Sequence, residues 1–506
     1  MGPFGLVNHS LAGAIAYGPP VRENAVWLVV ALLVGLAIAV LPPNVSLPVL
    51  AIVILCVFSL IDRRVALVSL LVIAPFKALI DTEVPGTFDL GQIALLATVA
   101  IWIARDIASR HRLGIVWTPL YVPIALFTFA ASISLWVSLS PAGTITELLK
   151  WIEMLVMIGL VMAMGRDYGP DWIAGAVIVS AVAQAILGIY QFNGGSGAPS
   201  LWILDFTHFR AFGSFGQPNP FGAFMGLTLP LALGTAFGAG TETWTRWTSL
   251  RVALIHTRDE VPPETWRDLR ISAARCVVFT AAAAILGAGL YVSWSRGAWI
   301  GFIAAAGVMI FLAPPRRLIG LALIGALVGG SFLAVVTGIT PASVVARISD
   351  FSAEFAGFND VRGQVITNAN YAVLERLAHW QAAIGMATDS PWLGVGFGDY
   401  AVAYPRFQLM NWRIPLGHAH NYYLNLWAET GIVGLVAYIA AWIAILALTL
   451  RALAQTSGFR RGIALGLLGT WTHLAVHSLF DNLYVNNLYL LIGVMLGLIG
   501  ILLEAV

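Results

Sequence analysis

Two groups of residues each place an arginine beside apolar stretches of the chain. The first group runs from His208 to Gly222 and contains Arg210 and Asn219 among glycines, prolines and aromatic residues. The second is a Ser-Arg-Gly sequence centred on Arg296, between two apolar stretches. The planar guanidinium of arginine matches a phosphate group and binds it through two parallel hydrogen bonds. The alternative for both groups is an arginine whose stem rests on apolar surface while its charged head reaches water.

A third group contains two histidines. His418 and His420 are two residues apart, and Asn421 follows them directly. A neutral imidazole is well suited to remove a proton near neutral pH, and the neighbouring amide has the groups to orient a substrate or the ring. A zinc pair is the alternative, but it needs a third ligand, and no cysteine or tight carboxylate cluster lies nearby in the sequence.

A fourth group lies within and just after an apolar stretch. His473, His477 and Asp481 are four residues apart, which puts them on one face of a helix. Ionisable groups inside a membrane are candidate functional residues by default, and such a stripe is also typical of a proton-coupled transporter. A hydrogen-bonded structural stripe is the alternative. Glu147 and Lys150 in another apolar stretch raise the same possibilities, or form a local ion pair.

The composition indicates a membrane protein. Of the 506 residues, 59% are hydrophobic and 10% are charged, against about 45–50% and about 25% in soluble domains. A net charge of +2 excludes a nucleic-acid-binding protein. Cys56 and Cys276 lie in or beside apolar segments, so no disulfide framework is expected.

We predict an all-α polytopic membrane protein with about 12–14 transmembrane helices, because a helical span needs about 20 apolar residues. The predicted spans are Trp27–Leu41, Leu47–Leu60, Val65–Ile80, Leu90–Ala104, Leu120–Leu139, Leu148–Met164, Trp172–Tyr190, Phe221–Phe237, Val277–Trp294, Ala298–Ala313, Leu318–Thr337, Gly431–Leu450, Ile463–Phe480 and Leu488–Leu503.

The basic residues predict an orientation. Of the 27 basic residues, 18 arginines fall in one set of alternate loops, beginning with Arg22, and seven fall in the opposite set. Lys77 and Lys150 lie within spans. Cytoplasmic loops carry the excess of basic residues, so the first set and both termini are predicted to be cytoplasmic. Arg210 and Arg296 then belong to the outer set.

Two loops are long. Residues Gly240 to Arg270 form a polar, basic cytoplasmic connector, while an outer loop runs from about Pro341 to His420. Within the outer loop, Ser343–Phe355 and Leu374–Ala387 have the spacing of short amphipathic helices. Long structured loops among tight connections are usually functional. We divide the chain into N-terminal helices (1–191), central helices with the arginine groups (192–340), the outer loop (341–425) and C-terminal helices (426–506).

The outer side therefore combines several arginines with a candidate base close to the membrane surface. A diphosphate presents a compact double anion that arginines hold and neutralise. The residues point to a lipid-diphosphate substrate in the outer leaflet, with a base that activates a hydroxyl nucleophile. The predicted reaction is glycosyl or phosphoryl transfer outside the cytoplasm.

These groups resemble motifs of the bacterial O-antigen ligase and O-antigen polymerase superfamily. Its pattern of His, then Asn, then nine residues and Gly-x-x-Gly is matched from His420-Asn421 to Gly431 and Gly434. The remaining similar segments are Arg376–Trp380, Pro391–Gly398, Arg210 with Gly213 and Asn219, Ser295–Gly297, and His477–Asp481. The resemblance extends from about Ala185 to Asp481.

The resemblance implies a metal-independent, inverting glycosyltransferase of GT-C-like, all-helical architecture that uses no cofactor. Its donor is a glycan carried on undecaprenyl diphosphate, and its acceptor is another glycan or lipid. The enzyme is expected in the bacterial cytoplasmic membrane, with its active site on the periplasmic or extracellular side. The motif assigns the catalytic histidine to His420. The implied donor-binding residues are Arg210, Arg296 and Arg376, and the supporting residues are Asn421, His418, Asn219, His477 and Asp481.

Two alternatives remain open at this point. A polymerase joins lipid-linked repeat units and shares the donor site and base with a ligase. A secondary transporter or flippase for a lipid-linked glycan fits the even number of spans and the stripe from His473 to Asp481. No inverted repeat is visible in the sequence, and alternating access does not need a long outer loop.

Overall fold

The computed structural model describes residues 58–59, 61–79, 89–111, 114–195, 201–204, 207–256, 261–347, 360–367 and 370–504. The chain divides into two compact units, Met1–Ala66 and Leu67–Val506. In the first unit, the Asp62 carboxylate accepts hydrogen bonds from the backbone and the guanidinium of Arg64. The predicted span Trp27–Leu41, and Leu47–Leu60 apart from residues 58 and 59, lie outside the described residues.

The described residues form a helical protein with one pair of very short strands, β1 and β2, in which Trp202 is opposite Phe209. The elements are α3 (Arg63–Ile73), η1 (Ala74–Phe76), α5 (Leu90–Arg110), α6 (Tyr121–Ser132), η2 (Ile133–Val137), α7 (Pro141–Tyr168), α8 (Pro170–Phe192), β1 (Trp202–Ile203), β2 (His208–Phe209), α9 (Pro218–His256), α10 (Pro263–Val292), α11 (Arg296–Leu312), α12 (Arg317–Val336), α14 (Tyr371–Asp389), α15 (Tyr400–Phe407), α16 (Tyr422–Gln455), α17 (Gly458–His477) and α18 (Leu488–Glu504).

Seven of the described helices are long and apolar enough to cross a membrane, namely α5, α7, α8, α9, α10, α12 and α16. Three shorter apolar segments cover α6 with η2, α11 and α18. The protein is an all-α polytopic membrane protein, as its composition predicts. Helix α17 occupies the predicted span Ile463–Phe480 but is not among the seven. It begins with two arginines and carries two histidines, which are tolerated because most of its residues are buried in protein.

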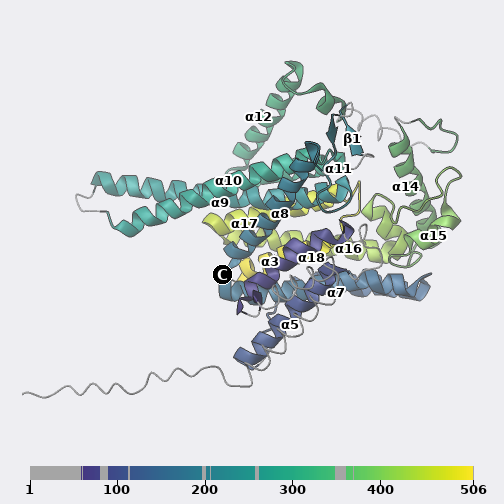
Figure 1. Ribbon diagram of the computed structural model, residues 1–506, viewed down its shortest axis with the longest axis horizontal. Coiled ribbons are helices and arrows are strands. Elements are labelled where there is room, and N and C mark those ends of the chain that lie inside the picture. The colour runs from purple at the N-terminus through teal and green to yellow at the C-terminus, as the bar shows by residue number, and fades with distance from the viewer. Residues whose placement is uncertain are drawn as a thin grey trace, which may run out of the picture. The chain divides into compact units, whose positions relative to one another are not determined.

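The predicted connector Gly240–Arg270 is not an irregular loop. Helix α9 runs to His256 and α10 starts at Pro263, and the two pack side by side in a long hairpin (Figure 1). At 1.5 Å per residue, 39 and 30 residues span about 58 and 45 Å, well beyond the bilayer core of about 30 Å. The polar segment stays helical because its residues pair along the helix, as Arg246 does with Glu242 at i, i+4.

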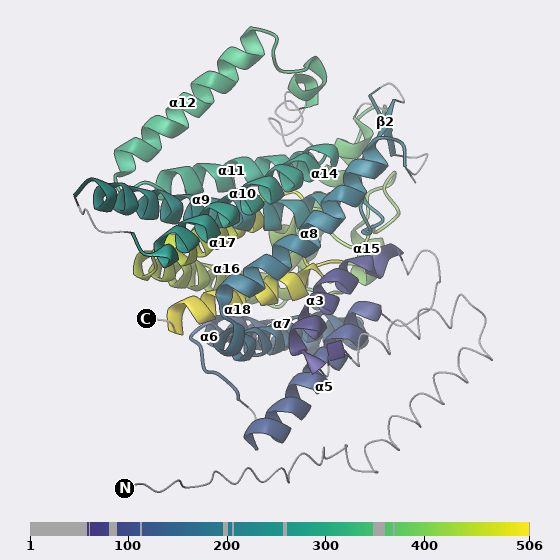
Figure 2. The same ribbon diagram turned by 60° about the vertical axis from the view of Figure 1, so that its left-hand side comes forward.

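Helix α17 lies between α9 and α16 in the second unit (Figure 2). Its contact with α9 is close because glycines face each other across the interface. A side chain at Gly234 would overlap the backbone of Gly462 and Gly466. Small residues spaced four apart let membrane helices approach closely, and backbone packing then stabilises the pair.

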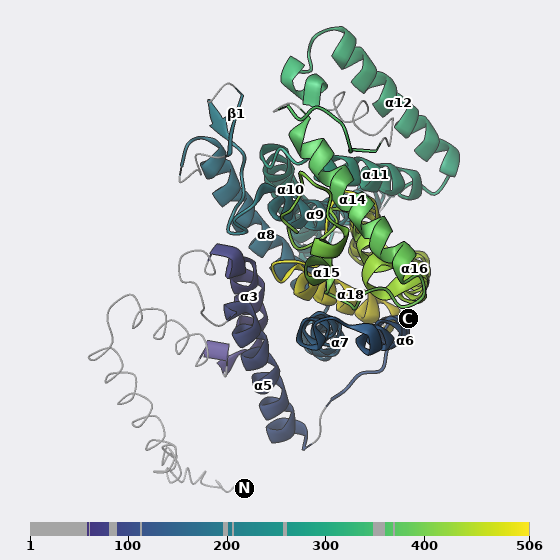
Figure 3. The same cartoon turned by 90° about the vertical axis from the view of Figure 1, so that its right-hand side faces the viewer.

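Much of the predicted outer loop is folded. Its predicted helix Leu374–Ala387 is confirmed as α14, whereas most of the predicted helix Ser343–Phe355 lies outside the described residues. Helices α14 and α15 pack against each other and against α16 (Figure 3). A buried cluster that includes Met386, Tyr400 and Tyr404 joins them. The loop is therefore attached to a membrane helix rather than free above it.

Helix α16 breaks at Gly431, one of the glycines of the His-Asn…Gly-x-x-Gly motif. The backbone there has φ 62° and ψ −167°, a conformation that residues with a side chain rarely adopt. A Cβ at this position would also overlap the backbone of Trp392. The segment between α14 and α15 thus lies directly against the break.

This segment replaces the hydrogen bonds that α16 loses at the break. A broken membrane helix must find partners for its freed backbone groups, because lipid offers none. Three backbone hydrogen bonds do this: Val395 N to Ala428 O at 3.0 Å, Gly396 N to Glu429 O at 2.9 Å and Ile432 N to Pro391 O at 2.8 Å. The segment from Pro391 to Gly396 therefore anchors the loop to the helix that follows the histidines.

We predict that Gly431→Ala destabilises the protein by about 2 kcal/mol or more, because alanine is strained at positive φ and its Cβ overlaps the inserted segment. The midpoint of thermal unfolding in detergent measures this. The matched control is Gly175→Ala in α8, where a Cβ meets no atom within 4 Å. Equal midpoints for the two variants would show that the inserted segment contributes little to stability.

Candidate functional site

The end of α17 and the start of α16 bring the histidine group to Asp481. The backbone N–H of Tyr422 donates to the carbonyl of Ser478 at 2.8 Å. The hydroxyl of Tyr423 donates to the carbonyl of Ala475 at 2.9 Å. These two hydrogen bonds hold the first turn of α16 against the last turn of α17. His420, just before α16, is thereby placed beside Asp481, just after α17.

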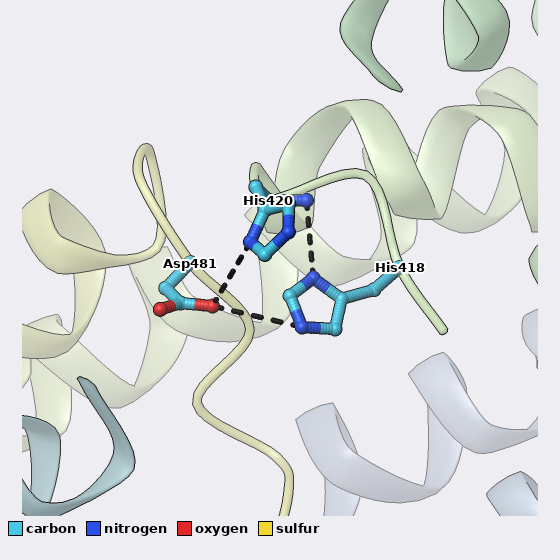
Figure 4. Close-up of side chains that lie close together, drawn as sticks. All are labelled: His418, His420 and Asp481. Atoms are coloured by element: carbon cyan, nitrogen blue, oxygen red, sulfur yellow. Dashed lines mark hydrogen bonds and ion pairs between the residues drawn. The ribbon is translucent and has the colours of Figure 1, made fainter. Parts of the chain in front are cut away.

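His418, His420 and Asp481 form a compact cluster (Figure 4). The Nδ1 atom of His420 lies 3.7 Å from Asp481 Oδ1, and the Nε2 atom of His418 also lies 3.7 Å from Oδ1. Both distances are longer than a hydrogen bond. His420 Nδ1 is buried without a hydrogen-bond partner, and its residue has the left-handed φ of 54°. The ring is therefore oriented toward the carboxylate by a strained backbone, and a small movement would close the gap.

The carboxylate is held in its charged form. Burial acts to raise the pKa of Asp481, but the neighbouring imidazoles of His420 and His418 and the charge of Arg376 outweigh burial and hold this pKa below its usual range. Burial, followed by the neighbouring His420, lowers the pKa of His418 to about 4. His418 is thus neutral at pH 7 and Asp481 is negative.

The two imidazoles and the carboxylate could in principle hold a metal ion, because their ligand atoms lie within 4.8 Å of one another. The tautomer of His418 opposes this. Its Nδ1 atom accepts a hydrogen bond of 3.0 Å from the backbone N–H of His420, so the proton of the neutral ring is on Nε2, facing Asp481. A histidine that binds a metal normally donates its second N–H to an acceptor. The hydrogen bonding instead suits a proton-transfer cluster.

Arg210 is held by the turn between α10 and α11. Its Nε atom donates to the carbonyl of Ser293 at 3.3 Å, and its Nη2 atom donates to Asn219 Oδ1 at 3.2 Å. Arg347, which follows α12, donates to the carbonyl of Trp294 at 3.2 Å. Two neighbouring carbonyls of one turn therefore hold two guanidinium groups from distant parts of the chain.

Four arginines gather around this turn. Burial, together with the positive charges of Arg347, Arg376 and Arg296, lowers the pKa of Arg210 to about 9, while Asp481 opposes this shift. The three other guanidinium groups and the carboxylate are thus all within electrostatic reach of Arg210. Even so, Arg210 remains charged at pH 7. The result is an excess of positive charge beside the imidazole cluster.

The positive ends of two helices add to this field. Helix α11 begins with Arg296 itself, and α9 begins at Pro218, next to Asn219. The two starts are close, since a Cβ on Gly222 would lie 3.0 Å from the Cβ of Ser295. Helix N-termini expose backbone N–H groups and favour anions. The arrangement fits a multiply charged anion such as a diphosphate.

Residues 281–439 match a family model described as O-Antigen ligase. This segment includes Arg296, Arg376, His418 and His420 and extends past the break at Gly431. This part of the chain is therefore similar to the O-antigen ligase family. The match, together with the apolar helices, points to a bacterial membrane protein with a glycan-transfer or ligase type of function. A search of curated proteins found none that matches the chain.

The segment that matches the O-antigen ligase model presents one face of α14 to the cluster. Arg376, His379 and Trp380 are three and four residues apart, and the indole of Trp380 donates to the carbonyl of His420 at 3.5 Å. The ring centroid of His379 lies 5.8 Å from that of His420. Burial, then the two other histidines, lowers the pKa of His379 to about 4. Helix α14 therefore braces the backbone and ring of His420.

Two residues of this site escaped the sequence-based prediction. Arg347 lies in the predicted outer loop but in no recognisable motif. His379 lies within the Arg376–Trp380 motif, where its spacing of three residues from Arg376 was the available signal. Both residues belong to the site because of contacts that the tertiary structure creates.

The stripe of His473 and His477 is buried in the protein, after the segment that matches the family model. His477 Nδ1 lies 3.2 Å from His473 Nε2. Space for the rings comes from glycines on α9 and α11: a Cβ on Gly226 or Gly301 would overlap His473, and one on Gly297 would lie 2.8 Å from His477. The stripe thus packs against the residue that follows Arg296 and leads to Asp481.

The remaining candidates have structural contacts. Asn421 caps α16, where its side-chain oxygen accepts from Leu424 N at 3.1 Å. Asn219 supports Arg210 as described. Lys150 pairs with Glu147 at i, i+3, which confirms the local ion pair.

The lowered pKa values of His418 and His379 predict an acid-sensitive protein. In the unfolded chain both rings take up a proton near pH 6.5, but in the folded protein only near pH 4. Between these values the unfolded state binds more protons, so stability falls as the pH falls. The contribution of His418 is up to about 3 kcal/mol.

We expect His418→Asn to reduce this pH dependence. Asparagine does not titrate, and its side-chain oxygen can still accept the N–H of residue 420, two positions on, as in an Asx turn. Thermal unfolding midpoints from pH 7 to pH 4 measure the slope, and the variant that also carries His379→Asn should flatten it further. A slope in His418→Asn equal to that of the wild type would contradict the assigned neutral state.

Proposed function

We propose that this protein is an inverting, metal-independent glycosyltransferase of the O-antigen ligase type. It transfers a glycan from an undecaprenyl-diphosphate carrier to an acceptor hydroxyl. The observation that carries the proposal is the position of His420, which faces the Asp481 carboxylate, a group within electrostatic reach of Arg210 and Arg376. A base and an anion site for a leaving diphosphate are what such a transfer requires.

The site is proposed to lie on the periplasmic or extracellular face of the bacterial cytoplasmic membrane. Arg210, Arg296, Arg347 and Arg376 all belong to the loops with few basic residues. The other ends of the same helices carry most of the arginines, which by the positive-inside rule remain in the cytoplasm. The undecaprenyl chain would stay in the lipid while its diphosphate reaches the arginines at the membrane surface.

His420 is proposed to act as the general base. Asp481 favours the tautomer with the proton on Nδ1, which leaves the lone pair on Nε2 for the acceptor hydroxyl. As Nε2 takes the hydroxyl proton, the hydroxyl oxygen attacks the anomeric carbon from the face opposite the diphosphate. The bond from that carbon to the diphosphate oxygen breaks, the carbon inverts, and undecaprenyl diphosphate leaves with the electron pair. Asp481 stabilises the resulting imidazolium.

The arginines are proposed to bind the donor and to stabilise the departing diphosphate. The arginines repel one another in the absence of an anion. When two phosphate groups lie among them, the attraction of each arginine to the phosphates offsets this repulsion. Arg210 and Arg347 are prepositioned by the carbonyls of Ser293 and Trp294, which limits the reorganisation needed on binding. Arg376, on α14, joins this site to the outer loop that would contact the acceptor.

We predict that His420→Ala lowers the rate of transfer by about 10²–10⁴-fold and leaves donor binding intact, because the base is lost and the arginines remain. Transfer from a defined undecaprenyl-diphosphate oligosaccharide by purified protein in detergent measures the rate. Added chelator should have no effect. His208→Ala, a histidine outside the cluster, is the matched control. Full activity of His420→Ala would remove the assignment of the base.

We predict that Arg210→Ala and Arg296→Ala each weaken donor binding roughly ten- to hundredfold, as expected for the loss of charged hydrogen bonds. Arg347→Ala should act in the same direction. The corresponding lysine variants should bind the donor better than the alanine variants. Equal losses of donor affinity in the lysine and alanine variants would show that bidentate hydrogen bonding matters, and not charge alone. Arg413→Ala, an exposed arginine of the outer loop, is the control. Unchanged donor binding in all three alanine variants would contradict the anion site.

The choice between ligase and polymerase depends on the acceptor. A ligase accepts a lipid A core, a protein or another lipid, and a polymerase accepts a second lipid-linked repeat unit. Offering each acceptor in turn to the purified protein distinguishes them. The same assay tests the transporter alternative. A transferase is expected to work in detergent, where there is no ion gradient, whereas a secondary transporter needs such a gradient.

A further inference from the structure

Two adjoining hollows lie at the end of the helices opposite the imidazole–arginine site. One has a volume of about 760 Å³ and the other about 750 Å³. Both are lined by Asp171, Arg275, Phe459 and Arg460, so they form one continuous feature, called here the paired hollow. Each of the two volumes is in the range of small-molecule binding sites.

The paired hollow lies at the other surface of the membrane. On α10, Arg275 is 17 residues before Val292, and on α17, Arg460 is 17 residues before His477. At 1.5 Å per residue, both helices place the arginines about 26 Å from the candidate active site. This separation is close to the thickness of the hydrocarbon core, so the paired hollow faces a headgroup layer.

The basic side of the paired hollow is preorganised. The Arg275 guanidinium lies 5.3 Å from the ring centroid of Phe459 and 3.4 Å from the Asp171 carboxylate. Arg461 is anchored by a hydrogen bond of 2.8 Å to the carbonyl of Leu453. Arg460 forms no hydrogen bond or ion pair within the part of the chain that the structure describes, so its five donors are available. Such an arrangement suits the oxygens of a phosphate diester.

Apolar residues line the paired hollow next to Arg275. Ile271, Ala274 and Val278 lie on the same face of α10 as Arg275, with the spacing i, i+3, i+4 and i+7. Ile271 and Val278 are 44% and 61% exposed. This face is therefore in position to contact lipid chains next to the arginine. Tyr168 and Trp172, which also line the paired hollow, are residues typical of the membrane interface.

We infer that the paired hollow binds the headgroup of an anionic phospholipid, with the phosphate at Arg275 and Arg460 and an acyl chain along the apolar face of α10. A free inorganic anion would use the arginines but would gain nothing from Ile271 and Val278. Basic pockets between membrane helices at the cytoplasmic surface are typical of such lipid sites. The inference does not depend on the proposed transferase activity.

The test is native mass spectrometry of the full-length purified chain with phosphatidylglycerol, cardiolipin and phosphatidylcholine. We expect the two anionic lipids to bind in preference to phosphatidylcholine. The double variant R275Q/R460Q should lose roughly thirtyfold in affinity for phosphatidylglycerol, the effect of two arginines at a membrane surface. The variant R275K/R460K keeps both charges and should retain most of the binding.

The matched control is R316Q/R451Q. These two exposed arginines are predicted to lie at the same membrane surface, and the variant loses the same charge, but neither lines the paired hollow. An equal loss in the control would show diffuse attraction and overturn the inference. Displacement of the lipid by excess inorganic phosphate, or equal binding of phosphatidylcholine by the wild type, would also overturn it. If R275Q/R460Q fails to elute as a single species, the inference is still tested by lipid binding of the lysine variant. It is also tested by the experiments with inorganic phosphate and phosphatidylcholine on the wild type.

Discussion

The concentration of positive charge around Asp481 is the constraint that organises this protein. Arg210 is buried within electrostatic reach of three other arginines, and the Asp481 carboxylate lies within reach of Arg210 and Arg376. Charges in such surroundings are costly unless they are paired or hydrogen-bonded. The fold meets part of this cost with the carbonyls of Ser293 and Trp294, which hold Arg210 and Arg347. The remaining excess of positive charge favours a bound anion.

The same carboxylate links the arginines to the imidazoles. Asp481 is equidistant from His418 and His420 at 3.7 Å, and the tautomer of His418 turns its N–H toward Asp481 as well. The Asp481 carboxylate thus orients the proposed base, and its negative charge offsets part of the positive charge of the arginines. Proton transfer and charge stabilisation are therefore coupled through one residue, which is an economical way to assist departure of a diphosphate as a hydroxyl attacks.

The outer loop is positioned by a membrane helix, which is unusual for a long connection. The break in α16 at Gly431 frees backbone groups, and the segment from Pro391 to Gly396 satisfies them. This joint fixes the first part of α16, and with it His420, eleven residues before Gly431. Residues on α14, including Arg376 and Trp380, reach the cluster from the same anchored loop. A base carried by a flexible loop would not hold this geometry.

Much of this architecture could be predicted from the sequence, because its signals are local. Apolar length determined most of the membrane helices, and the loop helix α14 followed from its amphipathic spacing. The residue types and motifs also singled out Arg210, Arg296, Arg376, His420 and Asp481, which the fold brings into one region. The length of α9 and α10 was missed, because a polar helix beyond the bilayer gives no hydropathy signal.

Other features were decided only by the tertiary structure. Arg347 and His379 join the site through contacts with a backbone carbonyl and with rings from distant segments, which no local pattern encodes. The glycine motif was visible in the sequence, but its physical role was not. Gly431 breaks α16, and the segment from Pro391 to Gly396 forms hydrogen bonds with the helix at the break. The sequence by itself determined which groups are present and which segments enter the membrane. Their mutual distances, and hence the chemistry available to them, depend on packing between helices far apart in the chain.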